Sequence, residues 1–171
     1  MVFSWIEWPS KAARDAGMQA LVEDERMESL DMPFDGARMV YGGFSTLIDK
    51  GSRVGVGYAD GFVAAVPVEN QAAYKAMASA MADLFVEQGA YRVVEAWGDD
   101  VPDGKVTDFR RAVAAKKGEA IVFSWIEWPS KKVRDEAWKK VMADPRASDP
   151  KGMPFDGKRL IHGGFATIFD A

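Results

Sequence analysis

The run VFSWIEWPSK occupies residues 2–11 and occurs again, letter for letter, at residues 122–131. The similarity extends further, because residues 2–49 match residues 122–170 with one additional residue in the second copy. A period of about 120 residues is too long for a solenoid. It indicates a domain-sized duplication in which the first copy starts halfway through the domain.

The composition leaves little room for cysteine or histidine chemistry. The 171 residues are 48% apolar and 28% charged, as in a globular protein, and they contain no cysteine and one histidine, His162. A disulfide framework, a thiolate nucleophile and a multi-histidine zinc site within one chain are therefore excluded. We expect no metal and no cofactor.

Charge and hydropathy also limit the partners. A net charge of −4 gives no electrostatic footprint for nucleic acid. No apolar run approaches the roughly 20 residues that span a bilayer, and the first residues lack the basic and apolar regions of a signal peptide. We therefore expect a cytoplasmic protein that binds neither nucleic acid nor a membrane.

The rest of the chain alternates between strand and helix signals. Four runs rich in β-forming residues are predicted as strands: 58–68, 90–98, 120–128 and 159–169. Helices are predicted over 69–89, where apolar residues recur at helical spacing, and over 131–144, which Ser130 can cap. The order β-α-β-β-α-β is the split βαβ pattern of an α+β, ferredoxin-like fold.

The chain thus divides into a partial repeat over 1–49, a linker over 50–56 and a complete ferredoxin-like domain over 57–171. The partial repeat is expected to be a β-α-β half-domain that holds the third strand, second helix and fourth strand of the fold. In the ferredoxin-like order 4-1-3-2, the first strand separates the fourth from the third. The half-domain therefore cannot close a sheet alone.

Both copies compete for the strands in residues 58–97. We favour the normal order, in which the second copy takes them and the first completes itself on the open face, on a sheet edge or on another chain. The alternative is a circular permutant whose strand 38–48 lies beside 58–66. A third possibility is that Met1 is a mis-called start within a longer tandem gene.

Four motifs in succession carry a family resemblance: YADGFVAAVP, VVEAWGDDVPDGKVTDFRRAV, VFSWIEWPSK and MPFDGKRLIHGGF. They resemble the YbaA-like bacterial family, a domain of unknown function, over residues 57–170, and residues 1–49 resemble its second half. The resemblance implies a fold of the dimeric α/β-barrel type, with two sheets paired in a homodimer or an intrachain pseudo-dimer. It implies no catalytic residues.

Strand alternation suggests a candidate pocket. Asp60, Glu95 and Glu127 share the parity of bulky aromatic residues on neighbouring strands, so we expect them on the sheet face away from the helices. Buried carboxylates there need a raised pKa or a cationic partner. The predicted strand 159–169 carries two such partners, Arg159 and His162, which point to opposite faces of the sheet, so only one of them can face the carboxylates. The full candidate set is Asp60, Glu95, Trp97, Trp125, Glu127, Arg159 and His162.

Three functions remain open for this face of the sheet. It can bind a small organic ligand, it can serve as a non-catalytic assembly or binding module, or it can be the site of a cofactor-independent small-molecule enzyme. Paired polar residues at a dimer interface would give the same pattern. The residues identify neither the ligand nor a reaction.

Overall fold

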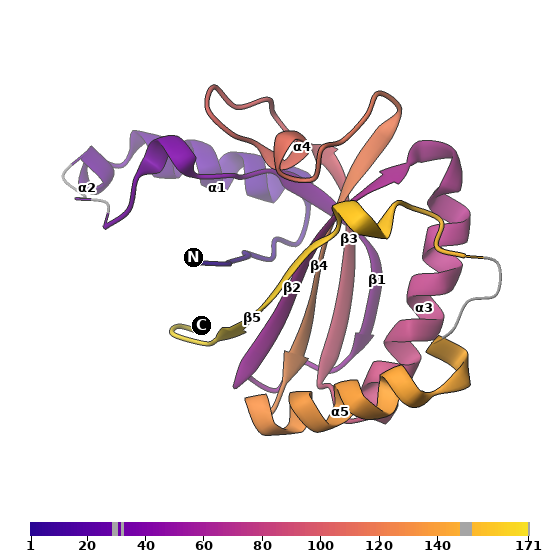
Figure 1. Ribbon diagram of the computed structural model, residues 1–171. Helices are drawn as coiled ribbons and strands as arrows, with labels where there is room; N and C mark the ends of the chain where they lie inside the picture. The colour runs from indigo at the N-terminus through magenta and orange to yellow at the C-terminus, as the bar shows by residue number, and fades with distance from the viewer. Residues whose placement is uncertain (29–30, 32, 148–151, 171) are drawn as a thin grey trace. The chain divides into compact units, whose positions relative to one another are not determined.

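The computed structural model of the chain describes residues 1–28, 31, 33–147 and 152–170 (Figure 1). The chain falls into two compact units, Met1–Met39 and Val40–Ala171. Residues 148–151, in the predicted loop before the last strand, lie outside the described residues.

The larger unit is built on a five-stranded sheet. Its strands are β1 (Gly43–Gly51), β2 (Tyr58–Pro67), β3 (Arg92–Asp100), β4 (Glu119–Trp128) and β5 (Ile161–Ala166). The order across the sheet is β1-β3-β4-β2-β5, and every neighbouring pair is antiparallel (Figure 1). Strands β2 to β5 have the 4-1-3-2 order, which confirms the predicted ferredoxin-like α+β fold and the normal pairing of the second copy.

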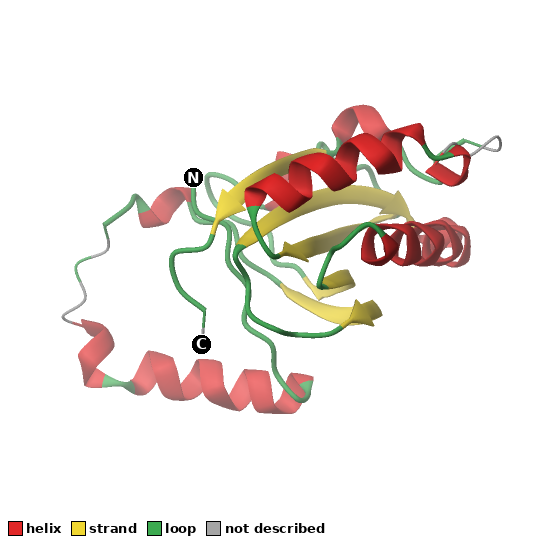
Figure 2. Cartoon of the chain, turned by 90° about the horizontal axis from the view of Figure 1, so that it is seen from below, coloured by secondary structure: helices red, strands yellow, loops and turns green. Residues whose placement is uncertain are grey.

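Two helices, α3 (Gln71–Glu87) and α5 (Lys131–Ala143), cover one face of this sheet (Figure 2). Helix α3 follows a 3-10 turn, η2 (Val68–Asn70), and stops before Gly89, whose φ of 107° lies in the left-handed region that favours glycine. Helix α5 begins after Ser130, whose side chain accepts a hydrogen bond from the Val133 amide.

Short elements connect the main ones: α4 (Phe109–Ala112), η3 (Pro145–Ala147) and η4 (Gly157–Arg159). The core between the sheet and the two helices is aliphatic and aromatic. Its most deeply buried large members are Val66, Leu84, Val122, Trp128 and Val141. Burial of each such side chain contributes roughly 1.5–3 kcal/mol, so this layer holds the helices on the sheet.

Strand β1 is the last strand of the first copy, and it extends the sheet at the outer edge of β3. The pairing runs from Gly43 opposite Asp100 to Gly51 opposite Arg92, with irregularities in the register. The Asp49 carboxylate receives two hydrogen bonds from the Arg92 guanidinium, both of 2.7 Å. The strand therefore completes itself on a sheet edge, one of the three outcomes expected for the normal order.

The smaller unit, Met1–Met39, contains helix α1 (Lys11–Glu23), the short helix α2 (Glu25–Glu28) and the 3-10 turn η1 (Gly36–Arg38). The strand expected at the start of the half-domain is not formed, since residues 1–8 have no regular secondary structure. A strand gains its hydrogen bonds from neighbours, and the described residues of this unit contain no other strand. A β-carbon at Gly17 would overlap the Trp8 ring, so the two lie in close contact.

In the part of the chain that the structure describes, no helix has the length and apolar character needed to cross a membrane.

Candidate functional site

The structure separates the seven candidate residues into groups on different sides of the sheet. Residues paired across antiparallel strands point to the same face, and Asp60 pairs with Ile126 while Ala59 pairs with Glu127. Asp60 therefore lies under the helices together with Glu95, which pairs with Ser124. The expectation that both carboxylates lie on the open face is wrong, because side-chain size was used where only the inter-strand register decides.

Asp60 is a buried anchor for helix α5. Its carboxylate accepts hydrogen bonds from Trp128 Nε1 at 3.0 Å, from Trp138 Nε1 at 2.8 Å and from Arg134 Nε at 2.9 Å. Arg134 Nη2 is 2.7 Å away as well, and the ion pair raises the pKa of Arg134. With only 1% of Asp60 exposed, its hydrogen-bonding capacity is used within the fold.

Trp125 and Glu127 lie on the other face of the sheet, away from α3 and α5. The indole Nε1 of Trp125 donates to Glu127 Oε1 at 2.9 Å, and Arg92 Nη1 is 3.5 Å from the same oxygen. Because α3 and α5 cover the opposite face, these residues cannot share a pocket with Asp60 or Glu95.

Arg159 precedes β5, in the turn η4, and it faces neither group. Its guanidinium donates two hydrogen bonds to the Glu119 carboxylate, at 2.7 and 2.6 Å, and one to the Ala114 carbonyl at 2.9 Å. The hydrogen bonds from Arg159 lower the pKa of Glu119 to about 2. This pair joins the start of β4 to the turn before β5 and has a structural role.

A row of side chains crosses the helix-covered face of the sheet from one edge to the other. The register aligns His162 with Phe62, Phe62 with Ser124, Ser124 with Glu95, and Glu95 with Ile48. His162 stacks on Phe62 with ring centroids 6.1 Å apart and an interplanar angle of 27°. The row thus brings two of the predicted candidates, Glu95 and His162, to the same face, together with a buried hydroxyl that the sequence did not single out.

Helix α3 completes the polar part of this row with Tyr74. The Tyr74 hydroxyl donates a 2.6 Å hydrogen bond to Glu95 Oε2, and the Ser124 hydroxyl lies close enough to both groups to lower their pKa values. Burial raises the pKa of Glu95, and the hydrogen bonds from Tyr74 and Ser124 offset part of this shift. Burial and the nearby carboxylate raise the pKa of Tyr74 well above its usual range, so its phenol remains a proton donor near neutral pH.

Two aromatic rings contact the Tyr74 ring. Trp97 lies edge-on to Tyr74 at 6.3 Å, and Phe155 contacts the same ring at 5.8 Å. Asn70, just before α3, donates to the Pro154 carbonyl at 2.8 Å and so fixes the segment that carries Phe155. Glu95, Trp97 and Phe155 are each partly exposed as residues, whereas Tyr74 and Ser124 are buried. We call Tyr74, Glu95, Trp97, Ser124 and Phe155 the Glu95 site.

Three members of the Glu95 site were missed from the sequence. Tyr74 lies in the apolar stripe of a predicted helix, where an aromatic residue is usually a packing residue. A phenol in the stripe that faces a strand carboxylate is the signal that could have found it. Ser124 could have been found from the register alone, because it stands between Phe62 and Glu95. Phe155 comes from a loop whose position the sequence does not specify.

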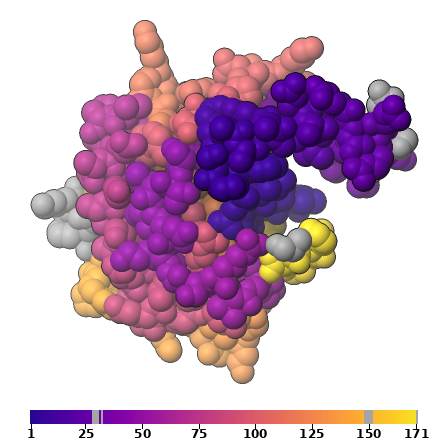
Figure 3. Space-filling model, turned by 180° about the vertical axis from the view of Figure 1, so that it is seen from behind, coloured from indigo at the N-terminus to yellow at the C-terminus, as the bar shows by residue number. Residues whose placement is uncertain are grey.

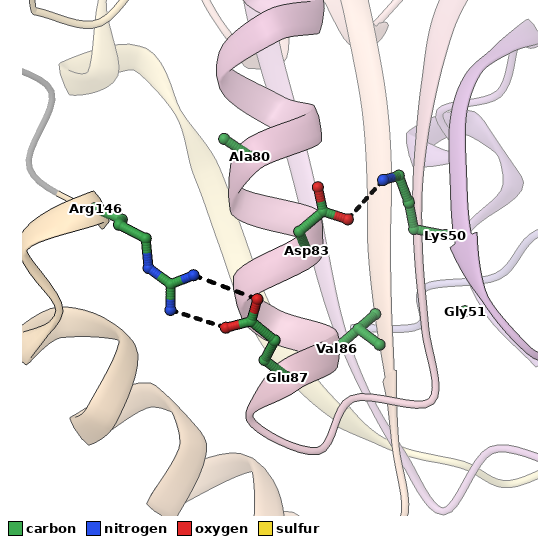
Figure 4. Close-up of a pocket in the computed structure, with 7 residues that line it drawn as sticks. All are labelled: Lys50, Gly51, Ala80, Asp83, Val86, Glu87 and Arg146. Atoms are coloured by element: carbon green, nitrogen blue, oxygen red, sulfur yellow. Dashed lines mark hydrogen bonds and ion pairs between the residues drawn. The ribbon is translucent and has the colours of Figure 1, made fainter.

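A hollow beside α3 has a different character from the Glu95 site. It has a volume of about 520 Å³ and is lined by Lys50, Gly51, Ala80, Asp83, Val86, Glu87 and Arg146 (Figure 4). Its charges are already paired, with Lys50 2.5 Å from Asp83 and Arg146 2.8 Å from Glu87, and these four side chains are 41–56% exposed. Solvated, neutralised ion pairs of this kind contribute little binding energy.

The chemistry of the Glu95 site is that of a carboxyl beside a phenol. Among the described residues, no group of three or more His, Cys, Asp or Glu side chains is arranged to hold a metal ion. A carboxyl with a raised pKa, close to a phenol and a hydroxyl, is a candidate group for proton transfer. The neighbouring rings offer a nonpolar surface for a planar group.

The sheet order and the two helices on one face define a ferredoxin-like α+β protein, and sequence comparison narrows the class to a family. The chain belongs to the family described as "Protein of unknown function (DUF1428)", whose model matches residues 1–36 and 57–157. It is 60% identical over 114 residues to "Uncharacterized protein YbaA" of Escherichia coli K12. The aligned residues cover 66% of this chain and 97% of that protein. A protein of the same name from Shigella flexneri gives the same identity and coverage.

Proposed function

We propose that the chain binds a small, planar organic molecule at the Glu95 site. The observation that carries this proposal is the Glu95 carboxyl, whose pKa burial raises and which accepts a 2.6 Å hydrogen bond from Tyr74, a ring that Trp97 and Phe155 both contact. Asp60 and Glu119 are each held by an arginine, whereas Glu95 has only neutral partners in the described structure. Glu95 therefore lacks the arginine that compensates the charge of Asp60 and of Glu119.

The chemistry of the site defines the class of ligand. A protonated Glu95 can donate a hydrogen bond to a carbonyl or hydroxyl oxygen, while Trp97 and Phe155 can contact the flat face or edge of the ligand. An anionic ligand would meet an uncompensated carboxylate above the pKa of Glu95. Neutral aromatic amides and phenols are thus favoured over benzoate-like acids.

The raised pKa also favours a second, narrower function, a cofactor-independent proton transfer. A carboxyl whose pKa burial raises keeps its proton to a higher pH than an ordinary glutamate, so it can protonate a bound oxygen or nitrogen and then be reprotonated by solvent. The buried Tyr74 phenol would hold the carboxyl in place. We rank this function after binding, since proton transfer requires that a ligand bind first.

A ligand-binding experiment tests the proposal. Benzamide, catechol and benzoate are titrated against the wild type, Glu95→Gln and Tyr74→Phe, and binding is followed by tryptophan fluorescence and thermal shift. Asp83→Asn is the matched control, because Asp83 is an exposed carboxylate on the same helix, α3. We expect benzamide or catechol to bind the wild type and the control but to bind both site variants at least about tenfold more weakly, a loss of about 1.4 kcal/mol. Equal binding by all four proteins would exclude the Glu95 site.

The pH dependence of stability tests the electrostatic part independently. Because burial raises the pKa of Glu95, the folded chain favours its protonated form. The stability that Glu95 contributes is full below the ordinary glutamate pKa and falls as the pH rises through the raised value. Glu95→Gln has no such loss, so its melting temperature should gain on that of the wild type between pH 4 and pH 8. A constant difference over this range would contradict the raised pKa.

A further inference from the structure

The two copies of the last repeat strand lie on opposite edges of one sheet, and they are not equally paired. The first copy gives the nine-residue strand β1 on β3, and the second gives the six-residue strand β5 on β2. Strand β5 stops at Ala166 because its partner β2 begins at Tyr58, opposite that residue. The equivalent position in β1, Ser45, is followed by six more strand residues.

The residues beyond β5 are apolar and exposed where their equivalents are covered. Ile168 is 89% exposed and Phe169 is 82% exposed, whereas Ile48, the counterpart of Phe169, is only 7% exposed. This C-terminal segment, yellow in Figure 3, lies at the surface of the molecule. The same sequence element is thus packed into the core where it has a full-length partner strand and stands in solvent where that partner ends.

Charge distinguishes the two copies in the same way. Asp49, the residue after the core residue Ile48, forms a bidentate ion pair with Arg92, with two hydrogen bonds of 2.7 Å. Its counterpart, Asp170, accepts a 3.1 Å hydrogen bond from the Val56 amide and lies 3.5 Å from Arg53. The second aspartate therefore has a looser ion pair than the first and would gain from an arginine placed as Arg92 is.

We propose that Gly164–Asp170 is a donor strand, which adds to the outer edge of a β3-type strand in a second chain as β1 adds to β3 here. The partner is a single-copy member of the same family, with an arginine at the position of Arg92 and no equivalent of β1. Relatives of that size exist, since 114 aligned residues cover 97% of the E. coli protein and leave room for one copy. In this chain β1 fills the β3 edge, so the chain donates a strand without accepting one.

The pairing is stereochemically open. Strand β5 uses one edge for β2, and its other edge has no strand neighbour among the described residues. A strand can pair on both edges, so β5 can stay in its own sheet while Gly164–Asp170 extends along a partner. The pairing would cover Phe169 as the core covers Ile48, which removes an exposed apolar side chain from water.

A disulfide-trapping experiment tests this pairing, because the chain has no cysteine of its own. Thr46 and Ala96 are register partners in the β1–β3 pair, and Thr167 is the counterpart of Thr46. The donor is the full chain with Thr167→Cys. The acceptor is the full chain with Ala96→Cys and Asp49→Arg, which places like charges at the Arg92 contact and so weakens the pairing of β1 with β3.

The control donor carries Met142→Cys instead, on the exposed surface of α5. We expect the 167–96 disulfide, identified by peptide mass spectrometry, to exceed the 142–96 disulfide about tenfold, and to fall to the control level when the donor also carries Phe169→Asp. A second acceptor, with Thr46→Pro in place of Asp49→Arg, opens the same edge by removing a backbone donor from β1. The proposal is overturned if folded acceptors, checked by circular dichroism, give no excess over the control, or if Phe169→Asp leaves the excess unchanged.

Discussion

The ten residues VFSWIEWPSK have two structures within one molecule. In the second copy they include most of β4, which lies between β2 and β3 and is buried along its whole length. In the first copy, residues 2–8 have no regular secondary structure, although the helix that follows is the same. Whether these residues form a strand therefore depends on neighbouring strands that can hydrogen-bond to them, whereas the start of the helix depends on the local sequence.

The local features that follow the strand are preserved in detail. Ser10 and Ser130 each accept a hydrogen bond from the amide three residues later. The pairs Lys11–Asp15 and Lys131–Asp135 both measure 2.6 Å. The copies begin to differ where long-range contacts start. Matched substitutions at equivalent positions should therefore have unequal effects in proportion to their tertiary contacts.

The largest difference is expected for the tryptophan that ends the repeated strand. Trp128 is fully buried, packs on Phe85 and donates to Asp60, while Trp8 is partly exposed and lies against Gly17. Trp128→Ala should lower the free energy of unfolding by about 3–5 kcal/mol. Trp8→Ala should lower it by no more than about 1 kcal/mol. Urea unfolding of both variants measures the difference, and equal losses would show that residues 2–8 are as strongly held as β4.

A smaller difference is expected for the arginine of the following helix. Arg134 binds the buried carboxylate of Asp60, whereas Arg14 forms an ion pair of 3.1 Å with the half-exposed Asp15. Arg134→Met leaves Asp60 with two tryptophan donors and should lower the free energy of unfolding by about 2 kcal/mol. Arg14→Met should lower it by less than Arg134→Met does, because the Asp15 carboxylate is half exposed and the Asp60 carboxylate is buried. The same denaturation assay checks both, and a large loss for Arg14→Met would reveal a buried partner for this residue.

The arginines of the second repeated turn, Arg38 and Arg159, should differ mainly in acid. Arg159 binds both Asp156 and Glu119, while Arg38 pairs with Asp35. Since the pKa of Glu119 is lowered from 4.5 to about 2, its contribution to stability is full above pH 4.5 and is lost as the pH falls through 2.

Melting temperatures between pH 2 and pH 6 test this asymmetry. Arg159→Gln should lower the melting temperature by about 5 °C at pH 6. Near pH 2 its melting temperature should equal that of the wild type. Arg38→Gln should follow the wild type throughout the range. Parallel curves for the two variants would mean that the Glu119–Arg159 pair adds nothing in the folded chain.

The features that sequence could predict are those set by short spacings. The helix over 71–87 and its end before Gly89 follow from apolar periodicity and a glycine stop. Alternation also correctly grouped Asp60 with Phe62 within one strand. Alternation does not determine the register between strands. A shift of one residue moves every side chain of a strand to the opposite face of the sheet. Asp60 and Glu95 were therefore assigned to the wrong side, and Glu127 was grouped with residues from which the sheet separates it.

The site depended on the same missing information. Glu95 was a candidate from its strand, but its partners Tyr74 and Phe155 come from a helix and a loop, and their approach is a tertiary event. The sequence also could not predict that residues 2–8 of the first copy form no strand. The sequence of 2–8 is a strong strand sequence, yet β4 already occupies the position between β2 and β3. Because residues 2–8 and 122–128 are identical, their sequence cannot predict which of the two segments occupies this position.

The smallest effect is expected at the two helix caps, and there the copies should agree. Ser10→Ala and Ser130→Ala each remove one hydrogen bond from the first turn of a helix, a loss of about 1 kcal/mol. Amide hydrogen exchange at Ala13 and Val133 should accelerate about fivefold in the respective variant. Ser→Thr at either position retains the acceptor oxygen and is the control. A much larger effect at Val133 than at Ala13 would show that packing of α5 against Asp60 and Val141, rather than the cap, sets the start of the helix, and the local part of the comparison would fail.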